Sequence, residues 1–244
     1  MSASERAPSS LWREPEREPE RLSWPALQLR DVFKIYRSGP IETVALRGLD
    51  LQVEQGEFIA VLGPSGCGKS TMLALAAALD EPSAGEVRAG EHSLLRLDEV
   101  ELARYRARGV ALVFQSENLW PALSARENVA LALRLSGEAD ASAAAEDALA
   151  SFGLRERAAH AAGALSGGEQ QRVAVAAAFA KDAPLVLADE PTGELDASNE
   201  RVVLEALADL RARRGSSVVL VTHSEEVASA ADRVIEMRDG KVAS

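Results

Sequence analysis

The sequence predicts an α/β protein in which a largely parallel sheet is covered by helices on both faces. Short apolar segments rich in Val, Leu and Ile alternate with helical segments, as in parallel strands buried on both sides. A glycine-rich turn separates one of these segments from a helix, and an alanine-rich helical stretch interrupts the alternation. We therefore expect one sheet domain over residues 26–244, with a helical subdomain inserted at about 116–163.

Each strand is predicted from a short apolar run that is bounded by turn residues. The expected strands, in chain order, are 27–36, 44–53, 58–62, 110–114, 185–188 and 217–222. A helix is expected over 69–79, directly after the glycine-rich turn. Residues 231–243 are predicted to form two further strands that turn at Asp239 and Gly240.

Composition restricts the class of protein. The formal net charge of −11 over 244 residues argues against a nucleic-acid partner that is bound through a general basic surface. A single cysteine excludes an intrachain disulfide and suits a reducing compartment. The longest apolar runs fall short of the roughly 20 residues that span a bilayer, and the first residues lack the apolar centre of a secretory signal. A cytoplasmic protein is expected.

The first 25 residues are predicted to be a disordered, charged tail. Arg-Glu-Pro-Glu occurs twice, at 13–16 and 17–20, and leaves little apolar surface to bury. Two interpretations stay open, a solvated extension or a peptide that binds a partner.

One glycine-rich turn matches the phosphate-loop pattern of Gly, four residues, and then Gly-Lys-Ser/Thr. It lies between a predicted buried strand and a predicted helix, the context that the pattern requires. Backbone N–H groups of such a loop wrap phosphates, the lysine neutralises the β- and γ-phosphates, and the serine hydroxyl binds Mg²⁺. The residues are Gly63, Pro64, Ser65, Gly66, Cys67, Gly68, Lys69 and Ser70. Cys67 contributes its backbone here, which makes a catalytic thiol improbable.

A second turn with anion-binding character occurs at residues 165–173, Leu-Ser-Gly-Gly-Glu-Gln-Gln-Arg-Val. Ser166 and Glu169 form the pattern of a capping box at the start of an alanine-rich helix. Gly167 and Gly168 leave the free N–H groups of the first helical turn uncovered, at the positive end of the helix dipole. Such a turn binds anions through its backbone.

Polar residues follow the predicted buried strands. Asp189 and Glu190 come after one strand, His223 after another and Gln115 after a third. Ligands of open α/β sheets bind at the carboxyl ends of the strands. In a phosphate-loop enzyme the aspartate holds Mg²⁺, and the adjacent glutamate takes a proton from the attacking water. His92 and His160 have no such setting and are expected at the surface.

The order and spacing of these motifs, together with Glu194-Leu195-Asp196, resemble the nucleotide-binding subunit of an ABC transporter from about residue 27 to 242. The resemblance implies a RecA-like phosphate-loop NTPase core with an N-terminal antiparallel β subdomain. The lipoprotein-release and macrolide-export ATPases show the most similar pattern. Three departures weaken only that subgroup assignment: Glu194 where Asn is usual, Ala177 where Arg is common, and no proline at 161–162.

The resemblance also implies roles for individual residues. Tyr36 would stack on adenine, although a core tyrosine is an alternative. Thr71 would extend the phosphate contacts of residues 63–70, and Gln115 would sense Mg²⁺ and the attacking water. Asp189 would hold the metal, Glu190 would act as the base, and His223 would contact the γ-phosphate. Ser166, Gly167, Gly168 and Asp196 would reach ATP that is held by a second copy of the chain.

The implied function is an ATP-hydrolysing subunit that dimerises around two ATP molecules and drives a separately encoded membrane permease, so that it is peripheral on the inner face of the cell membrane. A regulatory ABC ATPase of the cell-division type, which signals through a membrane partner without transport, is the alternative. A third class, ABC proteins of translation or DNA repair, fits less well. Trp120, close after Gln115, is expected either to dock the permease or to pack within the helical subdomain.

Overall fold

The structure is a computed structural model that describes residues 24–193 and 195–243. The expected tail lies outside the described residues except for Trp24 and Pro25, and so does the departure at Glu194. Trp24 stacks on Arg88, whose guanidinium carbon is 4.5 Å from the ring centroid. No helix in the described part of the chain is long and apolar enough to cross a membrane.

The central sheet has six strands in the order β10-β9-β3-β8-β7-β6. The five strands from β9 to β6 are parallel, and β10 pairs antiparallel with β9. The bounds are β3 (Phe58–Leu62), β6 (Val110–Val113), β7 (Leu185–Asp189), β8 (Ser217–Thr222), β9 (Arg233–Arg238) and β10 (Lys241–Val242). The strands predicted here from apolar runs are confirmed, as is the final pair that turns at Asp239 and Gly240.

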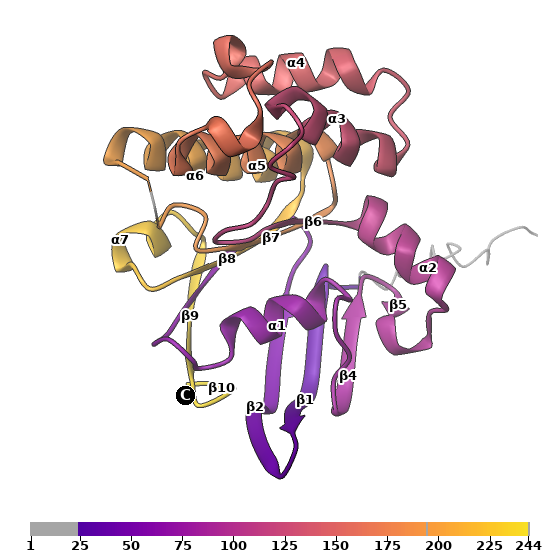
Figure 1. Cartoon of the computed structure of the whole chain (residues 1–244). Coiled ribbons are helices and arrows are strands. Elements are labelled where there is room, and N and C mark those ends of the chain that lie inside the picture. Colours follow the sequence, from indigo (N-terminus) through magenta and orange to yellow (C-terminus); the bar gives the residue numbers. More distant parts are fainter. Residues whose placement is uncertain (1–23, 194, 244) are drawn as a thin grey trace, which may run out of the picture.

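Helices lie on both faces of the central sheet (Figure 1), and the side chains of its strands belong to two buried clusters. In β8, Val218 and Leu220 belong to one buried cluster, whereas Val219 and Val221 belong to the other. Because successive side chains of a strand point to opposite faces, both faces of the sheet are covered. The first cluster contains side chains of α5 (Gly167–Lys181) and α6 (Ala197–Arg214), and the second contains those of α1 (Lys69–Ala76).

A second, antiparallel sheet covers α1 on its outer side (Figure 1). Its four strands lie in the order β2-β1-β4-β5. The bounds are β1 (Leu27–Ser38), β2 (Ile41–Val53), β4 (Ala84–Ala89) and β5 (His92–Ser93). The N-terminal antiparallel sheet of the expected fold class is thus present. Strand β4 was not predicted, because its Ala, Gly and Arg positions give it no apolar run.

The predicted helix over 69–79 is wrong at its end, because α1 stops at Ala76 and Ala78 adopts a left-handed φ of +53°. Leu79 is then half exposed, which an apolar periodicity could not foresee. The helices α3 (Ala125–Ser136) and α4 (Ala141–Ser151) pack on α5. Two short helices complete the fold, α2 (Glu99–Arg104) and α7 (Glu225–Ala228).

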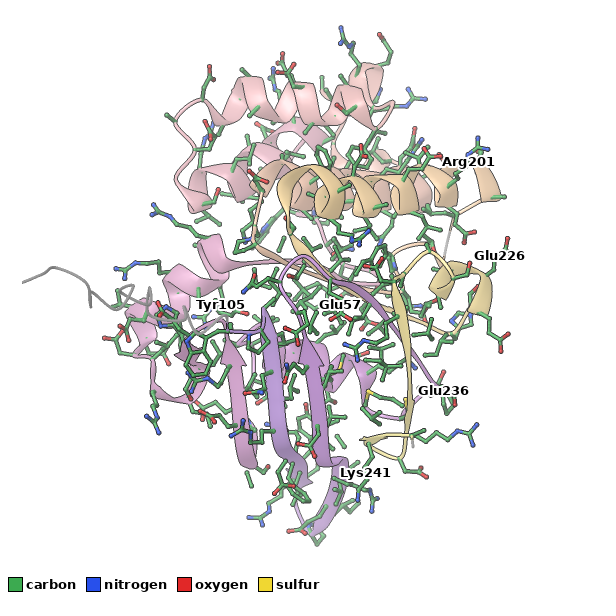
Figure 2. All side chains as sticks on the ribbon, turned by 180° about the vertical axis from the view of Figure 1, so that it is seen from behind. Glu57, Tyr105, Arg201, Glu226, Glu236 and Lys241 are labelled. Atoms are coloured by element: carbon green, nitrogen blue, oxygen red, sulfur yellow. The ribbon has the colours of Figure 1, made fainter. Side chains whose placement is uncertain are left out.

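A π-helical turn, Tyr105–Gly109, connects the helices on the two sides of the sheet. The Tyr105 hydroxyl donates to the Ala76 carbonyl at the end of α1, 2.7 Å away, and lies on the side of the molecule that carries α2 (Figure 2). Lys181, the last residue of α5, donates to the carbonyls of Arg106 and Val110 at 2.7 and 2.6 Å. Burial raises the pKa of Tyr105 and lowers that of Lys181 to about 8.

Candidate nucleotide site

The phosphate loop joins β3 to α1, and its glycines are required by close backbone contacts. Gly68 has a φ of +104°, and a Cβ there would lie 2.6 Å from the Ala45 carbonyl oxygen. A Cβ at Gly63 would lie 2.3 Å from the Met237 carbonyl oxygen. Neither carbonyl can move without breaking its strand, so only glycine fits at these two positions.

Lys69 places its positive charge inside this loop. Its ammonium donates to the carbonyl oxygens of Gly63 and Pro64 at 2.6 and 3.0 Å and lies 3.8 Å from the Cys67 sulfur. The lysine is only 9% exposed. A desolvated ammonium among backbone groups attracts an anion strongly, because water screens the charge little there. The loop therefore has the charge and the shape for a phosphate group.

The register of the central sheet aligns the polar strand ends beside the loop. Val113 pairs with Ala188, Asp189 pairs with Val221, and Leu62 pairs with Thr222. The residues that follow these positions therefore lie along one edge of the sheet. They are Gln115, Asp189, Glu190, His223 and Gly63.

Asp189 and Ser70 form a contact that suits a hard cation. The Ser70 hydroxyl donates to the Asp189 carboxylate, although burial and the nearby Glu190 charge raise the pKa of Asp189. No cluster of three or more His, Cys, Asp or Glu side chains that could hold a metal occurs in the described part of the chain. Two protein oxygens fit Mg²⁺, which is commonly held by one or two protein groups together with phosphates and water.

Glu190 is held at the mouth of the site by its neighbours. Its Oε1 lies 2.8 Å from His223 Nδ1, and its Oε2 accepts from the Thr222 hydroxyl at 3.2 Å. The Glu190 side chain is 13% exposed and that of His223 is 73% exposed. Both side chains thus lie at the same strand ends, one inside the site and one at its rim. Thr222 was missed by the sequence analysis, although a threonine closing an apolar strand is a visible signal.

Gln115 is exposed, and the loop that carries it is bonded to α5. Asn118 donates to the Phe114 carbonyl at 2.7 Å and to Gln171 Oε1 at 3.1 Å. Gln171 also donates to the Phe114 carbonyl at 3.1 Å. These two amides were not identified from the sequence. A polar Gln171 on a helix face that otherwise packs in the core was the available signal.

The second anion-binding turn has the predicted capping box. Ser166 Oγ accepts from the Glu169 N–H, and Glu169 Oε2 accepts from the Ser166 N–H at 2.9 Å. Arg157 donates to the other Glu169 oxygen at 2.8 Å. The hydrogen bond from Arg157, followed by those from Ser166, lowers the pKa of Glu169 to about 2. Ser166 and Gly167 are exposed, so the free N–H groups of the turn face solvent.

Asp196 is the N-cap of α6. Its Oδ1 accepts from the N–H groups of Ser198 and Asn199 at 3.0 and 2.9 Å, and its Oδ2 accepts from the Asn199 amide at 2.8 Å. Hydrogen bonds from Ser198 and Asn199 lower its pKa. The carboxylate therefore fixes the first turn of α6.

Tyr36 is not a core tyrosine, since it is 41% exposed. Its hydroxyl donates to Asp80 Oδ2 at 3.0 Å, and the Lys34 ammonium lies 4.9 Å from the ring centroid. Its strand partner is Thr43, two residues from the Ala45 carbonyl that touches Gly68. An aromatic face is thus available beside the phosphate loop.

The two anion-binding turns, at 63–71 and 166–168, do not form one site within a single copy of the chain. The helices α1 and α5, which begin at these turns, pack on opposite faces of the sheet (Figure 1). Within the described residues no hydrogen bond joins the turn at 166–168 to the loop at 63–71. The expected surface positions of His92 and His160 are confirmed, since both are exposed.

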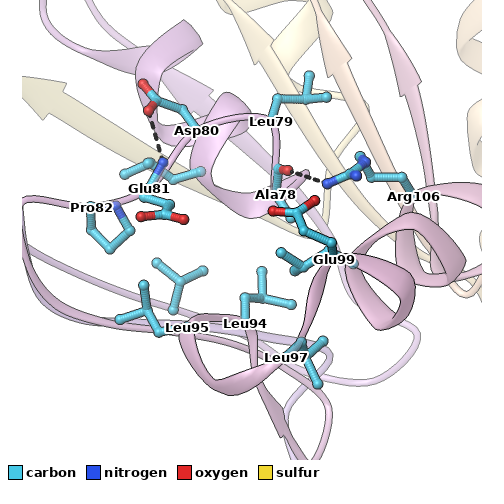
Figure 3. A pocket seen from close by; sticks show the side chains of 13 residues that line it. Ala78, Leu79, Asp80, Glu81, Pro82, Leu94, Leu95, Leu97, Glu99 and Arg106 are labelled. Carbon is cyan, nitrogen blue, oxygen red and sulfur yellow. Dashed lines mark hydrogen bonds between the residues drawn. The ribbon is translucent and has the colours of Figure 1, made fainter.

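Two hollows lie away from these residues. A cavity of about 410 Å³ lies between the end of α1 and α2, and six of its thirteen lining residues are leucines, among them Leu79, Leu94 and Leu95 (Figure 3). A groove of about 210 Å³ runs between α3 and α5 and includes Leu119 and Trp120. Trp120 is 67% exposed, so of the two expected alternatives, packing within the helical subdomain is excluded.

A phosphate loop that precedes α1, with two carboxylates at the end of the parallel strand β7, defines a phosphate-loop nucleotide hydrolase. The family model described as ABC transporter matches residues 46–193. The chain belongs to the ABC transporter family, and it is an ATP-binding cassette with ATPase activity.

Similar proteins confirm the predicted subgroup, the lipoprotein-release and macrolide-export ATPases. The chain is 43% identical to the lipoprotein-releasing system ATP-binding protein LolD of Geobacter metallireducens over 88% of this chain and 97% of the relative. It is 42% identical to the macrolide export ATP-binding/permease protein MacB of Marinobacter nauticus over 89% of this chain. The chain spans about a third of the length of that relative, 34%.

A solved structure has the same fold over most of the chain. The ATP-binding cassette MJ0796, described as a dimer in a post-hydrolysis state bound to ADP and Pi, superposes with a TM-score of 0.85 at 39% identity. The match covers 89% of this chain and 97% of that one. The expected fold class, a phosphate-loop core with an antiparallel sheet, is confirmed.

Proposed function

We propose that two copies of the chain bind two ATP molecules between them and use hydrolysis to drive a membrane permease. The observation that carries this proposal is the placement of the two anion-binding turns on opposite faces of one sheet. Within one copy, no hydrogen bond joins the turn at 166–168 to the loop at 63–71 in the described residues. A second copy in head-to-tail orientation would supply the missing turn to each loop. The dimer described for the solved cassette supports this arrangement.

In the proposed site, the loop N–H groups and Lys69 bind the phosphates, and Thr71 adds a hydroxyl. Tyr36 offers its ring to the adenine. Ser70, Asp189 and Gln115 would hold Mg²⁺, which supplies charge neutralisation for the transferred phosphoryl group. Ser166, Gly167, Gly168 and Asp196 would act on the ATP of the other copy.

Glu190 is proposed as the general base. Its carboxylate lies at the end of β7 and is held by Thr222 and His223. There it would take the proton from the water that attacks a phosphate on the loop. His223 is proposed to contact the γ-phosphate once ATP is bound. Loss of the γ-phosphate on hydrolysis would then open the dimer, and that motion would reach the permease.

The permease is proposed to be a separate polypeptide, so that the chain is held peripherally at the membrane. The LolD relative, of which the present chain covers 97%, is named for ATP binding alone, which supports this proposal. The name of the MacB relative combines ATP binding with a permease. The groove beside Trp120 is proposed to receive the permease.

The Glu190→Gln variant tests the site. We expect it to bind ATP but to hydrolyse it at least about 100-fold more slowly, since general-base catalysis contributes on the order of 10²–10⁴ in rate. It should accumulate as a dimer with ATP and stay monomeric with ADP, as measured by sedimentation velocity. Parental turnover in this variant would overturn the assignment of the base, and a strictly monomeric variant with ATP would overturn the shared site.

A further inference from the structure

The turn at 166–168 and the N-cap of α6 touch one another within one copy of the chain. A Cβ at Gly168 would lie 3.3 Å from the Leu195 Cδ2 atom, so the first turn of α5 packs on the residue before Asp196. The Leu195 N–H donates to the Thr192 carbonyl at 3.0 Å, and the Gly193 N–H donates to the Glu190 carbonyl at 3.2 Å. A shift of Leu195 against Gly168 would therefore also move the backbone that carries the proposed base, Glu190.

A chain of three polar side chains joins the two helices. Arg172, in the second turn of α5, donates from Nη1 to Asn199 Oδ1 at 2.6 Å. Asn199 donates from Nδ2 to Asp196 Oδ2 at 2.8 Å, and Asp196 caps α6 through its other oxygen. A charged donor makes the first of these bonds a strong one. The cap carboxylate is thus connected to α5 without an interruption.

A contribution to folding stability does not explain why an arginine occupies position 172. Its Nε is buried and has no hydrogen-bond partner within the described chain, and an unpaired buried N–H lowers the stability of the folded state. An unbranched apolar side chain of similar length would fill the same space without that cost. The feature that such a replacement would lose is the bond to Asn199.

We propose that Arg172 is a positioning residue that holds the Asp196 turn against the turn at 166–168, so that both meet the second copy as one rigid surface. The inference rests on the proposed shared ATP site and extends it to a residue that does not reach the nucleotide. Arg172 acts through Asn199, so the two side chains together hold Asp196 in place. Without the pair, the two turns would move independently and would have to be ordered when the dimer forms.

The test measures ATP-dependent dimerisation in the Glu190→Gln background by sedimentation. Arg172→Met is expected to raise the dimer dissociation constant about tenfold, which corresponds to losing one charge-assisted hydrogen bond. ATP affinity of the dilute monomer should change by less than about twofold, because the phosphate loop is untouched, and the unfolding midpoint in urea should not fall. Arg172→Lys, which keeps a donor, should recover part of the affinity.

Asn199→Ala should weaken the dimer to the same extent, and the double variant should be no weaker than either single one, because both remove one link. Arg201→Met is the control. Arg201 lies on α6 only two residues from Asn199, but its side chain is 75% exposed and its ion-pair partner, Glu205, lies on the same helix. We expect it to dimerise like the parent.

Dimerisation of Arg172→Met at the affinity of its background would overturn the inference, and so would a loss of unfolding free energy that accounts for the whole effect. Failure of the Glu190→Gln background itself to dimerise would overturn the shared site, and this inference with it. Additive effects in the double variant would show that Arg172 and Asn199 act separately, contrary to the proposal.

Discussion

Glu190 has a left-handed φ of +47° at the end of β7, a conformation that costs a glutamate free energy. The conformation persists because its N–H donates to the Val221 carbonyl at 2.9 Å and its carboxylate is held by His223 and Thr222. Residues in such conformations cluster where function requires a fixed geometry. The sequence placed Glu190 at the strand end, but it did not reveal the backbone twist that aims the side chain.

Glu169 yields a prediction of pH dependence. Its pKa in the folded chain is about 2, below the ordinary value of 4.5, because of Arg157 and Ser166. The ionised form is therefore favoured by folding, and its stabilising contribution is complete above about pH 4.5 and lost as the pH falls toward 2. The parent should exceed Glu169→Gln in unfolding free energy at pH 7, and this difference should shrink by pH 3, as measured by urea denaturation.

Glu146→Gln is the control for this measurement. Glu146 accepts from Arg126 at 2.7 Å, but its side chain is 55% exposed, and exposed ion pairs contribute little. We expect its unfolding free energy to follow that of the parent at both pH values. A difference between parent and Glu169→Gln that stays constant from pH 7 to pH 3 would contradict the assigned cause.

At the scale of elements, α3 and α5 both begin with a capping box. Each has a serine N-cap and a glutamate three residues later, and in each both reciprocal hydrogen bonds form. Such boxes depend on four consecutive residues, which is why the one in α5 could be predicted. Strand β4 could not be predicted, since packing between the sheets decides it. The early end of α1 could not be predicted either, since the left-handed backbone of Ala78 decides it.

The two boxes allow a matched comparison. Ser166→Ala and Ser124→Ala should each lower the unfolding free energy by about 1 kcal/mol, the usual cost of losing an N-cap. Only Ser166→Ala should also weaken ATP-dependent dimerisation, because the turn of α5 is the proposed contact to the second copy. Urea denaturation and sedimentation with ATP measure the two effects. Equal dimerisation by the two variants would remove the turn at 166–168 from the interface.

At the scale of the whole molecule, the groove beside Trp120 lies on the side of the sheet that carries α3 and α5. Trp120 is 67% exposed at its rim, and Lys181 is part of its lining. Lys181 also binds the turn that leads to the end of α1. A partner in this groove would thus contact the region that connects the helices of both proposed ATP-binding turns.

Trp120→Ala should leave basal ATPase activity within about twofold of the parent and lower the amount of tagged protein that pellets with membranes of the source cell. The reason is loss of a large apolar contact area, and indole side chains dominate such interfaces. Val100→Ala is the matched control, since Val100 is equally exposed, 67%, but lies on α2. Pelleting of Trp120→Ala at the parental level would remove the groove as a docking surface.

The sequence by itself determined the chemistry and most of the strands of this protein. The phosphate loop, the capping box at Ser166 and the polar residues after buried strands are local patterns, and local backbone geometry decides what they form. Only the tertiary structure decided that α1 and α5 lie on opposite sheet faces, that Tyr36 and Trp120 are exposed, and that Arg172 reaches Asn199. Periodicity tells which face of an element is buried. It does not tell which neighbour covers that face, because this depends on contacts between residues far apart in the chain.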